Sequence, residues 1–168
     1  DTPSTDLQEM PGFPNLLISE QWSSDNTLYN NTSLGIFRSK DGGKGWVPSN
    51  KGIGPVNVAV MIMAQITGAE TVLYAGTNKG IFVSRDSSDS WESASQGLPD
   101  GLNVNQMAIS PNYANDNVLF VALSNGIYRT LDGGLNWTLV NTGFQNKTPY
   151  VSYIAISPNF GSDSTVFS

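Results

Sequence analysis

Several residue types on which enzymes and metal sites depend are missing or scarce in this sequence. It contains no histidine and no cysteine. The lack of histidine removes the commonest general base and the commonest metal ligand. The lack of cysteine excludes disulfide bonds, thiolate zinc sites and cysteine nucleophiles. Charged residues make up only 13% of the chain, about half of their usual share.

The charge balance and the hydropathy pattern exclude two further classes of partner. The net charge is −6, and no basic stripe is present that could neutralise the phosphates of a nucleic acid. No apolar run approaches the roughly 20 residues that a membrane helix needs, so membrane insertion is not expected. Because the chain begins at Asp1 rather than at a methionine, we expect that it was processed or cut from something longer.

A repeat with a period near 45 residues dominates the sequence. Its first marker has the form Gly-Ile-aromatic followed by a polar loop and a tryptophan, and it occupies residues 35–46, 80–91 and 126–137. A second marker, Ala-Ile-Ser-Pro-Asn-aromatic, begins at Ala108 and again at Ala155, 47 residues later. A period of this size with several short strands per unit is typical of β-propellers.

Each repeat is predicted to form four strands. The first strand, at residues 104–110 in the third repeat, alternates and ends at Ile-Ser-Pro, and a polar turn leads to a short apolar second strand at 118–122. Asn125-Gly126 is a strong hairpin signal and precedes the third strand at 127–130. The fourth strand is predicted to begin at Trp137.

The predicted fold class is therefore all-β, a β-propeller with four-stranded antiparallel blades and about three and a half repeats. The predicted limits are a tail at 1–14, blades at 15–54, 55–102 and 103–147, and the first half of a fourth blade at 148–168. Propellers have about four to eight blades. The chain is therefore expected either to be part of a larger propeller or to complete its blades with other chains through open strand edges.

The polar loop of the first marker has the pattern Ser/Thr-x-Asp-x-Gly-x-x-Trp, which resembles the Asp-box of BNR, or sialidase-type, repeat propellers. The matching residues are Ser39, Asp41, Gly43 and Trp46; Ser84, Asp86 and Trp91; and Thr130, Asp132, Gly134 and Trp137. In the second copy Ser88 stands where the pattern has glycine, so this loop is expected to be looser. In the resembled family these boxes lie on the outer rim, away from the central binding face.

The residues of the box are predicted to be structural. The Asp carboxylate can accept hydrogen bonds from N–H groups of its own loop, and the Ser or Thr hydroxyl can brace the same turn. The tryptophan ring can pack between blades. Calcium binding is the alternative, by analogy with other Asp- and Gly-rich loops. Since each box supplies only one reliable carboxylate, the structural reading is preferred and no cofactor is expected.

The acids outside the repeat positions form no evident catalytic pair. A glycosidase needs two opposed carboxylates on one face of its site. The non-repetitive carboxylates within the blades are Glu20, Asp89, Glu92 and Asp100. Glu20 and Asp100 could be proposed as a pair, but nothing in the sequence places them together, and both are expected to be solvated.

The three arginines argue against sialidase chemistry in this segment. Among the resembled propellers, the sialidases use three arginines to grip the carboxylate of their substrate. Here Arg38 and Arg129 immediately precede a box, and Arg85 lies inside one. All three are therefore expected on the rim, where they would not converge on a central site.

Trp22 is a candidate carbohydrate contact. It is the one tryptophan outside a box, and its ring could stack on a sugar or could equally cover the end of the first blade. Tyr113 and Phe160 occupy equivalent repeat positions next to Pro-Asn and are expected to pack their turns.

The leading functional hypothesis is a non-catalytic extracellular or cell-surface propeller segment that binds or scaffolds, with carbohydrate as a possible ligand. The chain also resembles the photosystem II assembly factor family and sortilin-type receptors, which are binding propellers, although sortilin-type receptors carry disulfides. One alternative is a fragment of a glycoside hydrolase of the sialidase or xyloglucanase kind. Another is a self-assembling structural protein that completes its blades by strand sharing. Fold alone does not choose between them.

Overall fold

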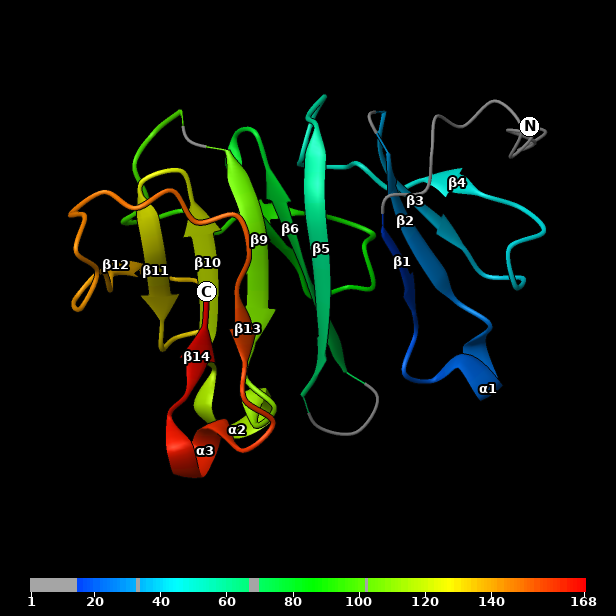
Figure 1. Ribbon diagram of the computed structural model, residues 1–168. Coiled ribbons are helices and arrows are strands. Elements are labelled where there is room, and N and C mark those ends of the chain that lie inside the picture. The colour runs from blue at the N-terminus through cyan, green and yellow to red at the C-terminus, as the bar shows by residue number, and fades with distance from the viewer. Residues whose placement is uncertain (1–14, 33, 67–69, 102) are drawn as a thin grey trace.

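The computed structural model describes residues 15–32, 34–66, 70–101 and 103–168, so the predicted tail at 1–14 lies outside the described residues. The described chain forms three four-stranded antiparallel sheets followed by a two-stranded one (Figure 1). In each sheet the strands are hydrogen-bonded in the order of the sequence. The predicted four-stranded antiparallel blades of a β-propeller are thereby confirmed.

Blade 1 contains β1 (Asn15–Ile18), β2 (Leu28–Thr32), β3 (Gly35–Ser39) and β4 (Val47–Pro48). Blade 2 contains β5 (Val58–Gln65), β6 (Thr71–Thr77), β7 (Gly80–Ser84) and β8 (Glu92–Ser93). Blade 3 contains β9 (Val104–Ile109), β10 (Leu119–Leu123), β11 (Gly126–Thr130) and β12 (Thr138–Leu139). The half-blade contains β13 (Ala155–Ile156) and β14 (Val166–Phe167).

Two details differ from the strands that the sequence predicts. The fourth strand of each blade begins one residue after its tryptophan and has only two residues, as in β12 after Trp137. The tryptophan itself turns inward and is buried. Strand β13 is also shorter than the predicted first strand of the half-blade, because only Ala155 and Ile156 pair with β14.

In blades 1 and 3 and in the half-blade, the first and second strands are joined by a short helical turn, where the sequence predicted an ordinary polar turn. These turns are α1 (Trp22–Asp25), α2 (Tyr113–Asp116) and α3 (Phe160–Asp163). In α2 the carboxylate of Asp116 accepts hydrogen bonds from the Ser110 hydroxyl at 2.6 Å and from the Val118 N–H at 2.9 Å. Four residues are too few to show a helical period in the sequence.

The hydrophobic core lies between consecutive blades. One cluster joins blades 1 and 2, a second joins blades 2 and 3, and a third joins blade 3 to the half-blade. The first strands β1, β5, β9 and β13 are neighbours, and Figure 1 shows them side by side at the front. They form one face of the blade array, which we call the inner surface, and in Figure 1 the later strands of blades 2 and 3 lie behind this face.

Candidate functional site

The three box loops, defined as residues 39–46, 84–91 and 130–137, are closed by their own hydrogen bonds. In the first, the Ser39 hydroxyl donates to Asp41 Oδ1 at 2.7 Å and accepts from the Gly43 N–H at 2.9 Å. Asp41 Oδ1 also accepts from the Gly45 N–H at 2.9 Å. The same bonds recur in the third loop around Thr130 and Asp132.

The second box loop keeps this hydrogen-bond pattern without glycine, so the loosening predicted from Ser88 is not observed. The Ser88 N–H donates to the Ser84 hydroxyl at 2.9 Å, as the glycines do in the other loops. The backbone achieves this by placing Ser87 and Ser88 at φ values of 58° and 67°. The buried Ser88 hydroxyl is also hydrogen-bonded to the Ser49 hydroxyl of blade 1 at 2.7 Å, which helps to hold the strained conformation.

Hydrogen bonding within the loops favours the ionised form of the box carboxylates. The Gly45 N–H, together with the Ser39 hydroxyl, lowers the pKa of Asp41. The hydroxyl of Thr130 and the side chain of Asn136 lower the pKa of Asp132. For Asp86, burial acts to raise the pKa, but hydrogen bonds from Ser90 and Ser84 outweigh it, and the pKa is again lowered. These carboxylates are therefore unsuited to act as general acids, which need a raised pKa.

The surroundings of the carboxylate oxygens in the box loops also indicate how well these loops could bind calcium. The oxygen Asp41 Oδ1 faces one N–H and one hydroxyl of its own loop, whereas calcium takes six to eight oxygen ligands. Among the described residues no group of three or more His, Cys, Asp or Glu side chains could hold a metal ion. Calcium binding stays a prediction that rests on the sequence pattern alone.

The box tryptophans join neighbouring blades. The Trp91 Nε1–H of blade 2 donates to the Ser49 carbonyl of blade 1 at 2.8 Å. The Trp137 Nε1–H of blade 3 donates to the Ala94 carbonyl of blade 2, also at 2.8 Å. Both rings are buried. Trp46 of blade 1 is equally buried, but no hydrogen-bond partner of its Nε1–H is present in the part of the chain that the structure describes.

Trp22 occupies the first position of α1, where α2 has Tyr113 and α3 has Phe160. It is thus a repeat position, and the correspondence is obscured in the sequence because Glu20-Gln21 replaces the Pro-Asn of the other copies. The Trp22 side chain is 39% exposed, and its ring lies over the first box loop near Gly42. The structure gives it a packing role, and its contact with carbohydrate stays a prediction.

The remaining candidate groups lie apart from one another. Glu20 borders a cavity with the end of β5 and with α2, whereas Asp100 borders a cavity at the beginning of β9, so they lie at opposite ends of the blades. Arg38 donates to the Ser87 carbonyl and pairs with Asp89 at 2.6 Å in the next blade. Arg129 lies at the junction with the half-blade. The acids and arginines therefore do not converge on one site.

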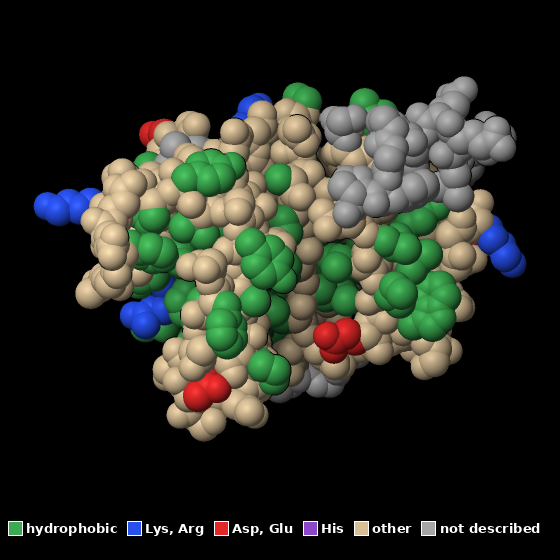
Figure 2. All heavy atoms as spheres, in the orientation of Figure 1, with side chains coloured by type: hydrophobic (Ala, Val, Ile, Leu, Met, Phe, Trp, Pro, Cys, Tyr) green, Lys and Arg blue, Asp and Glu red, His purple; other side chains and the backbone are tan. Residues whose placement is uncertain are grey.

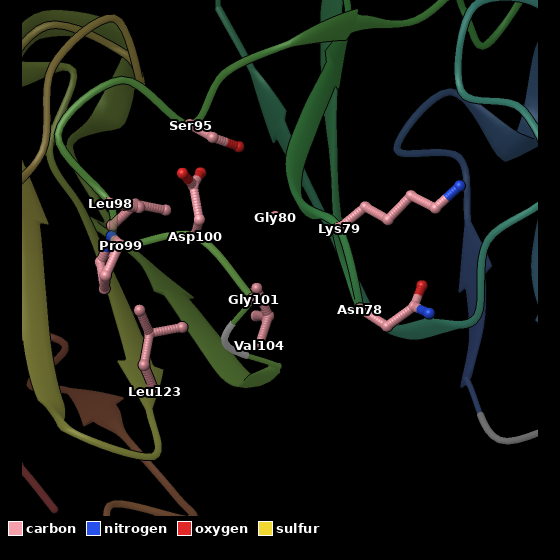
Figure 3. A pocket seen from close by; sticks show the side chains of 10 residues that line it. All are labelled: Asn78, Lys79, Gly80, Ser95, Leu98, Pro99, Asp100, Gly101, Val104 and Leu123. Atoms are coloured by element: carbon pink, nitrogen blue, oxygen red, sulfur yellow. The ribbon is translucent and has the colours of Figure 1, made fainter.

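The cavity that contains Asp100 lies between blades 2 and 3 and has a volume of about 200 Å³. Figure 3 shows Lys79 extending from the hairpin between β6 and β7, while Asp100 comes from the linker between the blades. The rest of its lining is mostly small or apolar, with Leu98, Val104 and Leu123. This volume is smaller than the roughly 300–1,000 Å³ of typical small-molecule sites, so the cavity suits a small polar group at most.

The inner surface of the array is apolar in part. Figure 2 shows hydrophobic side chains distributed across the face on which β1, β5, β9 and β13 lie. On β1 the exposed residues are Leu16 and Ile18, at 49% and 55%. Tyr153, which precedes β13, is 61% exposed. An extended apolar face of this kind is typical of a contact surface. Among the described residues no helix has the length and apolar character that crossing a membrane requires.

Comparison with known proteins gives structural similarity only. No family model matches the sequence, and no curated protein sequence matches it. The fold is similar to that of an ancestral GH74 enzyme, with 19% identity and a TM-score of 0.68 over 89% of this chain and 21% of that one. It is also similar to the extracellular domain of BT4673 from B. thetaiotaomicron, with 18% identity and a TM-score of 0.65 over 90% of this chain and 19% of that one.

A third similar structure is PorZ, a surface component of the type-IX secretion system of Porphyromonas gingivalis, with 14% identity and a TM-score of 0.55 over 86% of this chain and 18% of that one. The chain thus spans about a fifth of the length of these structures. At such low identity the similarity establishes the fold and no shared activity. The chain is a segment with the β-propeller fold.

Proposed function

We propose that this chain is a non-catalytic propeller segment of an extracellular or cell-surface protein, where it serves as a binding or structural scaffold. The observation that carries the proposal is the state of its carboxylates. Hydrogen bonds within the loops lower the pKa values of the carboxylates of Asp41, Asp86, Asp132 and Asp163. The extracellular or surface location is supported by the BT4673 domain and by PorZ, which are described in those terms.

The absence of catalysis can be tested with the purified chain on a panel of sialosides and β-glucans at high protein concentration. We expect no hydrolysis above that of buffer. Glu20→Gln and Asp100→Asn variants serve as matched controls, because these acids lie outside the box loops. Hydrolysis by the parent chain that either substitution abolishes would overturn the proposal.

Binding of carbohydrate can be read at Trp22, because the other three tryptophans are buried. On the scaffold proposal, β-glucan oligosaccharides that stack on this ring would shift its fluorescence. Trp22→Phe should remove the shift and leave the fold intact, since phenylalanine occupies the equivalent position in α3. A shift that persists in Trp22→Phe would show that carbohydrate does not bind at this ring.

A second candidate function is that of a blade segment within a glycoside hydrolase, and the similarity to the GH74 enzyme favours it. The chain covers only 21% of that enzyme. In this case the chain would support a site whose catalytic acids are supplied by other blades. Hydrolysis by the chain itself would favour this second candidate, whereas the separate positions of Glu20 and Asp100 argue against such activity.

A further inference from the structure

The two complete blade junctions provide a template for a third. At the first junction the Trp91 ring packs in one buried cluster with Tyr29, Ile36 and Ile53 of blade 1 and its linker. Its Nε1–H donates to the Ser49 carbonyl. The second junction repeats this with repeat-equivalent residues, because Trp137 packs with Tyr74, Ile81, Ala94 and Leu98 and donates to the Ala94 carbonyl.

At the third junction the equivalent residues line a cavity. In blade 3 and its linker they are Phe120, Ile127, Val140 and Phe144, and all four border a cavity of about 320 Å³. The half-blade closes its other side with Phe160 and Val166. A cavity of about 150 Å³ can already hold benzene, so this one has room for an indole ring. We call it the third-junction slot.

The surroundings of Gly143 also indicate that the third junction can receive a tryptophan, as the two complete junctions do. At the two complete junctions the equivalent glycines are Gly52 and Gly97, where a Cβ would stand 2.1 Å from the Trp91 carbonyl oxygen and 2.3 Å from that of Trp137. All three glycines have a φ between 90° and 100°. At Gly143, however, a Cβ would meet nothing within 4 Å. The chain therefore has the glycine that a docked tryptophan backbone requires, next to open space.

Arg129 also corresponds to a residue that makes contacts at the first blade junction. Its repeat equivalent, Arg38, reaches the box loop of the next blade, where it donates to the Ser87 carbonyl and pairs with Asp89 at 2.6 Å. Arg129 lines the third-junction slot, and no hydrogen bond or ion pair of its guanidinium is present among the described residues. Its Nε is buried and has no hydrogen-bond partner within the described ranges. An acidic side chain on an incoming loop would satisfy it.

The outer edge of β14 completes the site. In the complete blades the second strand pairs with the first strand on one side and with the third on the other, as β10 does with β9 and β11. Within the described residues, β14 pairs only with β13. Its far edge, along Val166 and Phe167, can accept a further antiparallel strand.

We propose that the third-junction slot and the β14 edge bind a two-stranded hairpin with a Ser/Thr-x-Asp-x-x-x-x-Trp loop. The hairpin adds its first strand to β14 and inserts its tryptophan ring into the slot. The indole N–H donates to the Val140 carbonyl, and the loop backbone passes over Gly143. An acid three residues after the loop aspartate, the position of Asp89 in blade 2, pairs with Arg129.

The occupant is a hairpin from outside these 168 residues and not one from a second copy of the chain. Each of the three box hairpins of the chain is already part of a four-stranded blade. A second copy could supply one only by dismantling that blade and losing a buried tryptophan contact. This inference concerns assembly and does not depend on whether the propeller is catalytic.

The direct test is a titration of the full chain with a fluorescently labelled peptide that copies residues 122–141, followed by anisotropy. We expect saturable binding at one site per chain. A peptide in which the tryptophan copied from Trp137 is replaced by alanine should bind at least about thirtyfold more weakly, as for the loss of an interface hot spot.

Two glycine variants of the chain locate the site. Gly143→Ala should weaken binding at least about tenfold, because its Cβ would collide with the docked backbone as it would at Gly52 and Gly97. Gly54→Ala is the matched control, since Gly54 also has a positive φ and open space around it but lies in the first linker. Equal effects of the two substitutions would overturn the proposal.

An isolated hairpin is marginally stable in water, so a second measurement attaches it covalently. Phe120 and Phe167 are repeat equivalents, and a copy of residues 122–141 placed directly after Ser168 therefore continues the repeat in register. This extension should raise Tm by at least about 5 °C relative to the same extension with its tryptophan replaced by alanine.

Three results would overturn the inference. The first is a tryptophan that makes no difference in either the peptide or the extension. The second is a Gly143→Ala variant that leaves both responses unchanged. The third is a dimer of the unextended chain, seen by light scattering, that Gly143→Ala dissociates, because the occupant would then be a second copy.

Discussion

At the residue scale, the fold depends on tryptophans whose rings are buried between blades and whose indole N–H groups donate hydrogen bonds. Trp91 and Trp137 each fill the space between two blades and bond to a carbonyl of the preceding blade. Trp22 belongs to another repeat position and remains partly exposed above a box loop. The four tryptophans therefore differ in their contribution to stability, although they have the same side chain.

Trp91→Ala is expected to lower the free energy of unfolding by about 3–5 kcal/mol, as for other large buried aromatic side chains. The loss includes the hydrogen bond to the Ser49 carbonyl, which would be left without its donor. Trp22→Ala is the matched control and should cost less than half as much. Urea denaturation followed by circular dichroism measures both, and equal losses would contradict this account of the blade junction.

At the element scale, the box loop is a closed hydrogen-bond unit whose backbone needs two consecutive residues at positive φ. Glycine fills both places in the first and third loops, at Gly42-Gly43 and Gly133-Gly134. The second loop adopts the same conformation with Ser87 and Ser88. A left-handed conformation costs a non-glycine residue about 1–2 kcal/mol, so this loop carries strain that the other two lack.

Ser87→Gly is therefore expected to stabilise the chain by about 0.5–1 kcal/mol, because relief of the strain exceeds the entropy that glycine adds to the unfolded state. The carbonyl at this position, which accepts from Arg38, is unchanged. The matched control is Ser23→Gly in α1, where φ is not positive and where glycine should destabilise. Thermal melts of the two variants should shift in opposite directions; a lower Tm for Ser87→Gly would contradict the strain argument.

The sequence identifies these elements unequally well. The repeat markers predicted the sheets and the box loops, because strand and turn signals recur at one spacing. The helical turns α1, α2 and α3 were missed because each is four residues long. The relation of Trp22 to Tyr113 was obscured by the substituted Glu20-Gln21. Contacts between blades, such as that of Arg38 with Asp89, depend on the packing of separate repeats and leave no local signal.

At the scale of the whole molecule, one unit is repeated and each blade is stabilised by its neighbour. The clusters at successive junctions are built from equivalent residues. Stability is therefore expected to arise from the junctions as much as from the single blades, as in other repeat proteins. The third-junction slot is the place where we propose that this array accepts a further hairpin.

The box carboxylates are expected to make the free energy of unfolding decrease as the pH falls. Their folded pKa values lie below the ordinary value of 3.8, so their contribution is fully present above about pH 4 to 5. It is lost as the pH falls through the lower folded values and the carboxylates become protonated. Urea midpoints should therefore decrease between about pH 5 and pH 2.

Asp132→Asn tests whether the box is the source of that pH dependence. The variant should be less stable than the parent at pH 7, because an amide is a weaker acceptor for the loop N–H and hydroxyl groups. Its stability should also change less between pH 5 and pH 2. An unchanged dependence would assign the effect to other acids.

The central claim is that each complete blade junction is locked by an indole N–H donated to the preceding blade. Hydrogen exchange of the four indole N–H groups, followed by NMR and assigned with single Trp→Phe variants, tests it most directly. We expect slow exchange for Trp91 and Trp137, whose N–H groups are buried and bonded, and fast exchange for Trp22, which is 39% exposed. Rapid exchange of Trp91 and Trp137, at the rate of Trp22, would contradict the claim.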